Sequence, residues 1–98
     1  MQEIYTEVIN FTLQVPKESS FVSLCTGMVH HGSEFKANIT IQVEDGQIVD
    51  LKSILGIMTL CYSNGRSARI VIEGTDADDV EGAYMCLTKY LDTYSHFQ

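Results

Sequence analysis

The spacing of apolar residues switches several times between two periods along the chain, and the order of these periods restricts the folds it can adopt. Apolar residues at every second position indicate a strand with one buried face, whereas spacings of three and four indicate an amphipathic helix. The periods predict a strand, a helix, two strands, a short helix, a strand and a long helix. One four-stranded sheet with every helix on one face gives an α+β, open-faced two-layer sandwich. The periods do not decide between parallel and antiparallel pairing.

The predicted elements have residue bounds that capping and turn residues support. We expect strands at 4–15, 37–43, 47–51 and 68–73, and helices at 21–30, 53–62 and 75–94. Side chains favoured at helix starts precede the three helices: Ser19 and Ser20, Ser53, and Thr75 with Asp78. Gly32 is suited to end the first helix, and turn-forming residues lie at 44–46 and 63–65.

The size and charge of the chain exclude several classes of partner. Its 98 residues fit one domain, 1–98. Six basic residues against 13 acidic ones give a formal charge of -7, which repels phosphate backbones and anionic lipid. No apolar run reaches the roughly 18 residues of a membrane span, and the first residues lack a secretion signal. We therefore expect a cytosolic protein that binds neither nucleic acid nor membrane.

The residues that usually bind metals are poorly placed for it here. Cys25, Cys61 and Cys86 lie in separate apolar segments, which indicates reduced, buried thiols. The adjacent His30 and His31 diverge by about 100° on a helix, and His96 lies near the end of the chain. The acidic residues at 76–81 are better explained as complements of a helix dipole than as a cation site. The sequence thus predicts no metal and no cofactor.

The segment 50–60 carries more apolar residues than one helix stripe needs. Ser53 is a candidate N-cap, and five apolar residues follow it: Ile54, Leu55, Ile57, Met58 and Leu60. One interpretation is a surface left exposed for docking. The alternative is an ordinary short core helix that starts at a serine.

The same segment resembles the second-helix region of HPr, the phosphocarrier family of the bacterial sugar phosphotransferase system. The similar text is Val49-Asp50-Leu51-Lys52-Ser53-Ile54-Leu55-Gly56-Ile57-Met58-Thr59-Leu60, and the resemblance extends over nearly the whole chain. It implies a βαββαβα fold with an antiparallel sheet. Ser53 matches the serine that HPr kinase/phosphorylase modifies in that family. Ile54, Leu55 and Met58 match the surface that docks on the kinase and on a transcriptional regulator.

The chain departs from the family at the start of the first helix. HPr carries its phosphoryl group on a histidine there, next to an arginine, whereas this chain has Phe21 and Ser23 in those places. We therefore expect no catalytic residue and no enzyme, but a regulatory binding protein controlled by phosphorylation of Ser53. Two alternatives stay open. One is a degenerate phosphocarrier that uses another residue, such as His30 or His31, and the other is an interaction module independent of phosphorylation.

Overall fold

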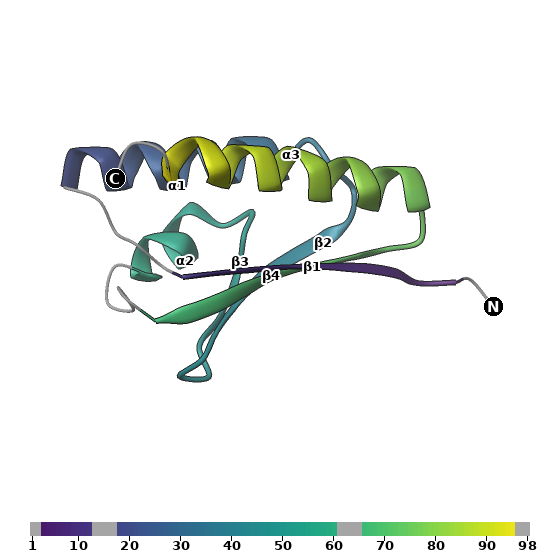
Figure 1. Cartoon of the computed structure of the whole chain (residues 1–98), viewed down its shortest axis with the longest axis horizontal. Helices are drawn as coiled ribbons and strands as arrows, with labels where there is room; N and C mark the ends of the chain where they lie inside the picture. The colour runs from purple at the N-terminus through teal and green to yellow at the C-terminus, as the bar shows by residue number, and fades with distance from the viewer. Residues whose placement is uncertain (1–2, 13–17, 61–65, 96–98) are drawn as a thin grey trace.

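The computed structural model describes residues 3–12, 18–60 and 66–95, except for the side chains of 18–22 and 93–95. The elements follow the predicted order and form one sheet with three helices on one face (Figure 1). They are β1 (Tyr5–Thr12), α1 (Glu18–Gly32), β2 (Asn38–Val43), β3 (Ile48–Asp50), α2 (Ile54–Met58), β4 (Ser67–Gly74) and α3 (Ala77–Ser95). This arrangement confirms the predicted open-faced sandwich.

The sheet has the strand order β1-β4-β2-β3, and all of its pairings are antiparallel. The antiparallel pairing implied by the family resemblance is therefore confirmed. A tight turn closes the β2–β3 hairpin. Gly46 in this turn has φ +99°, a conformation that costs glycine little. Leu13 and Val15 of the first predicted strand, and the predicted turn 63–65, lie outside the described residues.

The core lies between the sheet and the helices. Alternate residues of β2 and β4 point into it, and Ile39, Ile41, Ile70 and Ile72 are at most 1% exposed. From the edge strand β1, Ile9 and Phe11 pack against this core but are only partly buried. From the helices come a further set of buried residues: Cys25, Met28, Ile57, Val80, Ala83 and Leu87. Tyr84 and Leu91 of the predicted α3 stripe pack partly buried at its margin.

The first helix begins earlier than its apolar spacing indicated. It starts at Glu18, so Ser19 and Ser20 lie within α1. The prediction that they cap a helix beginning at Phe21 is therefore wrong. Its last residue, Gly32, does not have a positive φ, although the sequence suggested a glycine stop. A Cβ at Gly32 would collide with the Leu51 side chain. Glycine is needed there for close packing and not for its backbone freedom.

Carboxylates at the start of α3 have two structural tasks. Asp76 accepts hydrogen bonds from the amides of Asp78 and Asp79 at 3.0 and 3.3 Å. The N-cap of the helix is therefore Asp76, and not Thr75 as the sequence had suggested. Asp79 accepts hydrogen bonds from the amides of Lys36 and Ala37 at 3.2 and 2.8 Å. It thereby fixes the loop between α1 and β2 against α3. These contacts support the capping interpretation of the acidic cluster.

Candidate functional site

Ser53 occupies the N-cap of α2, as its sequence position predicted. Its backbone is extended (φ -106°, ψ 110°), and its Oγ accepts a hydrogen bond from the Gly56 amide at 3.3 Å. A turn presents it, because the Ser53 amide donates to the Asp50 carbonyl at 3.0 Å, and the Asp50 carboxylate accepts from the Lys52 amide at 2.9 Å. The residue is half-buried. Its hydroxyl therefore sits in an ordered turn beside the amides of the first helical turn.

The apolar residues that follow Ser53 divide between two faces of α2. Ile57 and Leu60 are 0% and 2% exposed and belong to the core. Ile54, Leu55 and Met58 are 37%, 78% and 39% exposed. The segment thus has two faces: one packs as an ordinary core helix, and the other leaves three apolar side chains accessible beside Ser53. That these three form a docking surface stays a prediction.

Hydrogen bonds fix both ends of α2. At its start, Lys52 Nζ donates to the Phe35 carbonyl at 2.8 Å, which ties this turn to the loop after α1. At its end, the Thr59 amide bonds back to Gly56 and Ile57, and the Thr59 hydroxyl donates to the Gly56 carbonyl at 2.6 Å. Gln47 Nε2 in turn donates to Thr59 Oγ1 at 2.7 Å. The helix therefore ends at Met58, four residues before the predicted end near Tyr62.

The start of α1, where the resemblance placed the family's histidine, has the sequence Glu18-Ser19-Ser20-Phe21-Val22-Ser23. Phe21 lies within α1, and its side chain is outside what the structure describes. Ser23 is exposed, and its carbonyl accepts a hydrogen bond from the Tyr90 hydroxyl of α3 at 3.3 Å. A Cβ at Gly27 would collide with that hydroxyl, so glycine permits α1 and α3 to approach closely.

Two histidines, His30 and His31, and one cysteine lie at the opposite end of α1. His30 Nε2 lies 3.5 Å from Glu34 Oε1, and His31 Nδ1 lies 3.7 Å from Cys86 Sγ. Cys86 is half-buried rather than buried as expected, whereas Cys25 is buried; Cys61 and His96 lie outside the described residues. Burial raises the pKa of the Cys86 thiol, and the charge of Glu34 raises it further, against a lowering by Lys89. Within the described ranges, no three His, Cys, Asp or Glu residues are grouped so as to hold a metal ion.

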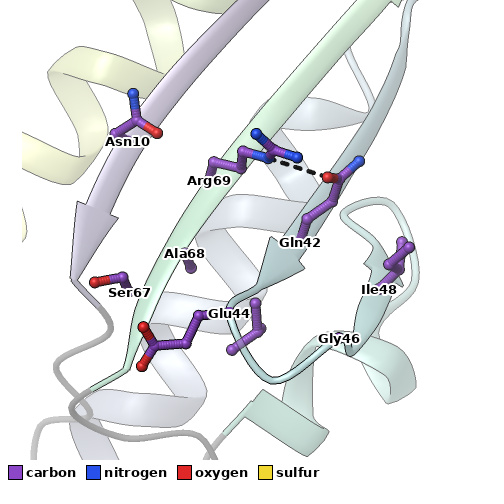
Figure 2. Close-up of a pocket in the computed structure, with 9 residues that line it drawn as sticks. Asn10, Gln42, Glu44, Gly46, Ile48, Ser67, Ala68 and Arg69 are labelled. Atoms are coloured by element: carbon purple, nitrogen blue, oxygen red, sulfur yellow. Dashed lines mark hydrogen bonds between the residues drawn. The ribbon is translucent and has the colours of Figure 1, made fainter.

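A shallow hollow lies on the face of the sheet that the helices leave uncovered (Figure 2). Cross-strand register places Asn10, Arg69 and Gln42 in one row of three strands, and Arg69 Nε donates to Gln42 Oε1 at 3.1 Å. Sequence reasoning did not find this row, because it depends on which strands are neighbours. The hollow shares no lining residue with the Ser53 segment.

Comparisons with known proteins agree with this geometry. The family model described as "PTS HPr component phosphorylation site" matches residues 24–92. The phosphocarrier protein HPr from Bacillus anthracis str. Ames is 28% identical, with a TM-score of 0.63 over 89% of this chain and 95% of that one. HPr-C-His from Thermoanaerobacter tengcongensis is 25% identical, with a TM-score of 0.60 over 91% and 92% of the two chains.

These matches extend over the helices and strands that lie before and after the Ser53 segment in the sequence. No helix in the described part of the chain is long and apolar enough to cross a membrane. The family model covers more than half of the sequence and includes all of α2, β2, β3 and β4. The chain therefore belongs to the HPr family of the phosphotransferase system.

Proposed function

We propose that this protein is a regulatory binding module of the HPr family, not an enzyme, whose docking on partner proteins is controlled by phosphorylation of Ser53. The observation that carries the proposal is that Ser53 caps the short helix whose exposed apolar residues are Ile54, Leu55 and Met58. A modification at Ser53 would adjoin the apolar surface that a partner covers. HPr kinase/phosphorylase and a transcriptional regulator are the partners that the family resemblance suggests.

The local geometry is compatible with a phosphate on Ser53. The hydroxyl already faces the Gly56 amide at 3.3 Å, and backbone amides at a helix start favour negative charge. The Lys52 ammonium, which now bonds the Phe35 carbonyl, belongs to the adjacent residue. A phosphoserine oxygen can compete for that ammonium as a charge-assisted acceptor. Phosphorylation would then change both the charge and the hydrogen bonds beside the docking surface without unfolding α2.

The first helix supports the absence of histidine phosphocarrier activity. Residues 18–23 contain no imidazole and no guanidinium, and the family-model match starts at residue 24, after them. His30 is nine residues further along α1 than Phe21, which corresponds to about 14 Å of helix. A phosphoryl donor that engages the start of α1 would not reach it there.

Two phosphotransfer assays test the proposal. The protein is incubated with HPr kinase and ATP, and separately with enzyme I and phosphoenolpyruvate, and its intact mass is measured. We expect one phosphoryl group from the kinase on the wild type and on Ser67→Ala, whose serine lies exposed on β4, and none on Ser53→Ala. A wild type that stays unmodified by active kinase would refute the proposal.

The enzyme I arm distinguishes the degenerate phosphocarrier. An acid-labile phosphate that disappears in His30→Gln or His31→Gln would establish it and refute our proposal that histidine phosphocarrier activity is absent. The phosphorylation-independent module is favoured by the exposure of Leu55 at 78% in the unmodified protein. It predicts a bound partner whose affinity is the same for wild type and Ser53→Ala but falls for Leu55→Ala.

A further inference from the structure

The two edges of the sheet differ in how well they are protected from pairing with another chain. The strand β3 has three residues and leads directly into the turn before α2, so it offers little edge. The strand β1 has eight residues, and of the described residues only those of β4 pair with it. Its register runs without interruption from Tyr5↔Gly74 to Thr12↔Ser67. A long regular edge of this kind is a template for a further strand.

Several of the devices that usually block an edge strand are missing from β1. Proteins protect edges with lysine, proline, bulges or very short strands. Residues 5–12 contain no lysine and no proline, their one charged residue is Glu7, and the pairing with β4 contains no bulge. The exposed large apolar residues of the described chain also gather here. Three of the eight are Ile4, Tyr5 and Val8, at 66%, 38% and 40% exposure, and three others belong to α2.

The charge around the start of β1 indicates what kind of segment would bind. Seven of the 13 acidic residues lie in 3–7 and 73–81, where there is no lysine or arginine: Glu3, Glu7, Glu73, Asp76, Asp78, Asp79 and Glu81. The other six acidic residues equal the six basic ones in number, so the formal charge of -7 belongs to this part of the chain.

The fold brings these two acidic stretches together. Thr6 pairs with Glu73 and Tyr5 with Gly74, and α3 begins three residues later. Figure 1 shows the start of α3 above the N-terminal half of β1, at the same end of the molecule. The adjoining loop contributes one basic residue, Lys36, whose backbone amide donates a hydrogen bond to the Asp79 carboxylate. The edge of β1 is therefore bordered by a strongly acidic corner.

We propose that the open edge of β1 binds an extended, cationic segment of another protein as a fifth strand of the sheet. Backbone hydrogen bonds to β1 supply the ladder, as in other cases of strand addition. In an antiparallel pair, residues directly opposite each other share one face. The segment would place basic residues opposite Glu3 and Glu7 and an apolar residue opposite Val8. A second copy of this chain is disfavoured, because its own edge, residues 3–12, contains no lysine or arginine to place opposite Glu3 and Glu7.

The test uses a fluorescent eight-residue peptide in which lysine alternates with valine, titrated into the full chain. A control peptide of equal charge alternates lysine with proline, which removes amide donors and cannot form a regular ladder. We expect the control to bind at least tenfold more weakly. Amide hydrogen exchange should slow in Tyr5–Thr12 when the valine peptide is bound. Equal binding of the two peptides, or slowed exchange in α2 instead, would overturn the proposal.

Two protein variants separate the acidic corner from general charge. Glu3→Gln with Glu7→Gln should weaken binding of the valine peptide about fivefold, the scale of two exposed ion pairs. Glu44→Gln with Asp92→Asn removes two exposed carboxylates outside this corner and should leave the affinity nearly unchanged. If both double variants weaken peptide binding equally, the proposal that the acidic corner selects a cationic segment is refuted. It is also refuted if, without peptide, hydrogen exchange in β1 becomes slower as the protein concentration rises, because β1 would then pair with a second copy. Ser53→Ala should not change this binding, which keeps the result independent of the proposed function.

Discussion

The division of α2 into a core face and an exposed face makes a sharp prediction about two neighbouring residues. Burial of a whole leucine or isoleucine side chain stabilises a protein by about 1.5–3 kcal/mol. Leu55 is 78% exposed, so truncation to alanine should lower the free energy of unfolding by only about 0.3–0.7 kcal/mol. Ile57 is 0% exposed, and Ile57→Ala should lower it by about 2–5 kcal/mol, since the cavity adds to the lost burial.

Urea unfolding followed by far-UV circular dichroism measures both free energies. The reverse order should appear in a docking assay with the family's kinase. If Leu55 is an anchor of the docking surface, Leu55→Ala should lower kcat/KM for Ser53 phosphorylation about tenfold, which corresponds to about 1.4 kcal/mol. The folded fraction of Ile57→Ala should be phosphorylated at close to the wild-type rate, because its side chain does not reach the surface.

The two measurements together can refute the reasoning. If Leu55→Ala unfolds as easily as Ile57→Ala, the leucine contributes to packing and α2 is a core helix only. If Leu55→Ala is as stable as the wild type and is phosphorylated equally well, the exposed residues are not the docking surface. Met58→Ala, at 39% exposure, serves as an intermediate case and should be affected in both assays.

Three further predictions concern residues outside α2. Gly46→Ala should lower the free energy of unfolding by about 1–2 kcal/mol, because φ +99° is strained for any residue with a Cβ; an unchanged midpoint in urea would contradict this. Asp79→Ala should cost about 1–3 kcal/mol and speed hydrogen exchange at the Ala37 amide, which loses its 2.8 Å acceptor; unchanged exchange there would contradict it. Because the pKa of the Cys86 thiol is raised by burial and then by Glu34, folding keeps its proton to higher pH, and its contribution to stability is lost as pH rises. The wild type should therefore lose stability relative to Cys86→Ser above the ordinary thiol pKa of 9.0, and parallel pH curves would contradict this.

Much of the local structure followed from residues close together in the sequence. Ser53 could be recognised as a cap because an N-cap bonds an amide only a few residues away. The start of α3 shows the limit of this reasoning. Both Thr75 and Asp76 precede the helix and both have suitable side chains, and the choice of Asp76 depends on where the helical backbone begins. The early start of α1 at Glu18 has a similar origin, since apolar spacing begins only at Phe21 and does not record the polar residues 18–20 before it.

The candidate site was predictable in kind but not in detail. The excess of apolar residues after Ser53 indicated that some would remain exposed, and the helical period could not say which. Packing against the sheet decided it, by burying Ile57 and Leu60 and leaving Leu55 outside. The row of Asn10, Arg69 and Gln42 could not be anticipated, because those residues are up to 59 positions apart and meet only through the order of the strands.

The number, kind and order of the elements could be predicted from local spacing, because strand and helix periods are properties of neighbouring residues and of the backbone angles they favour. Which strands are adjacent became known only from the folded chain, in which β1 lies at an edge with its acidic residues beside the start of α3. Strand order is set by the side chains that the whole core can bury together. Contacts between distant residues carry that information, and local spacing does not.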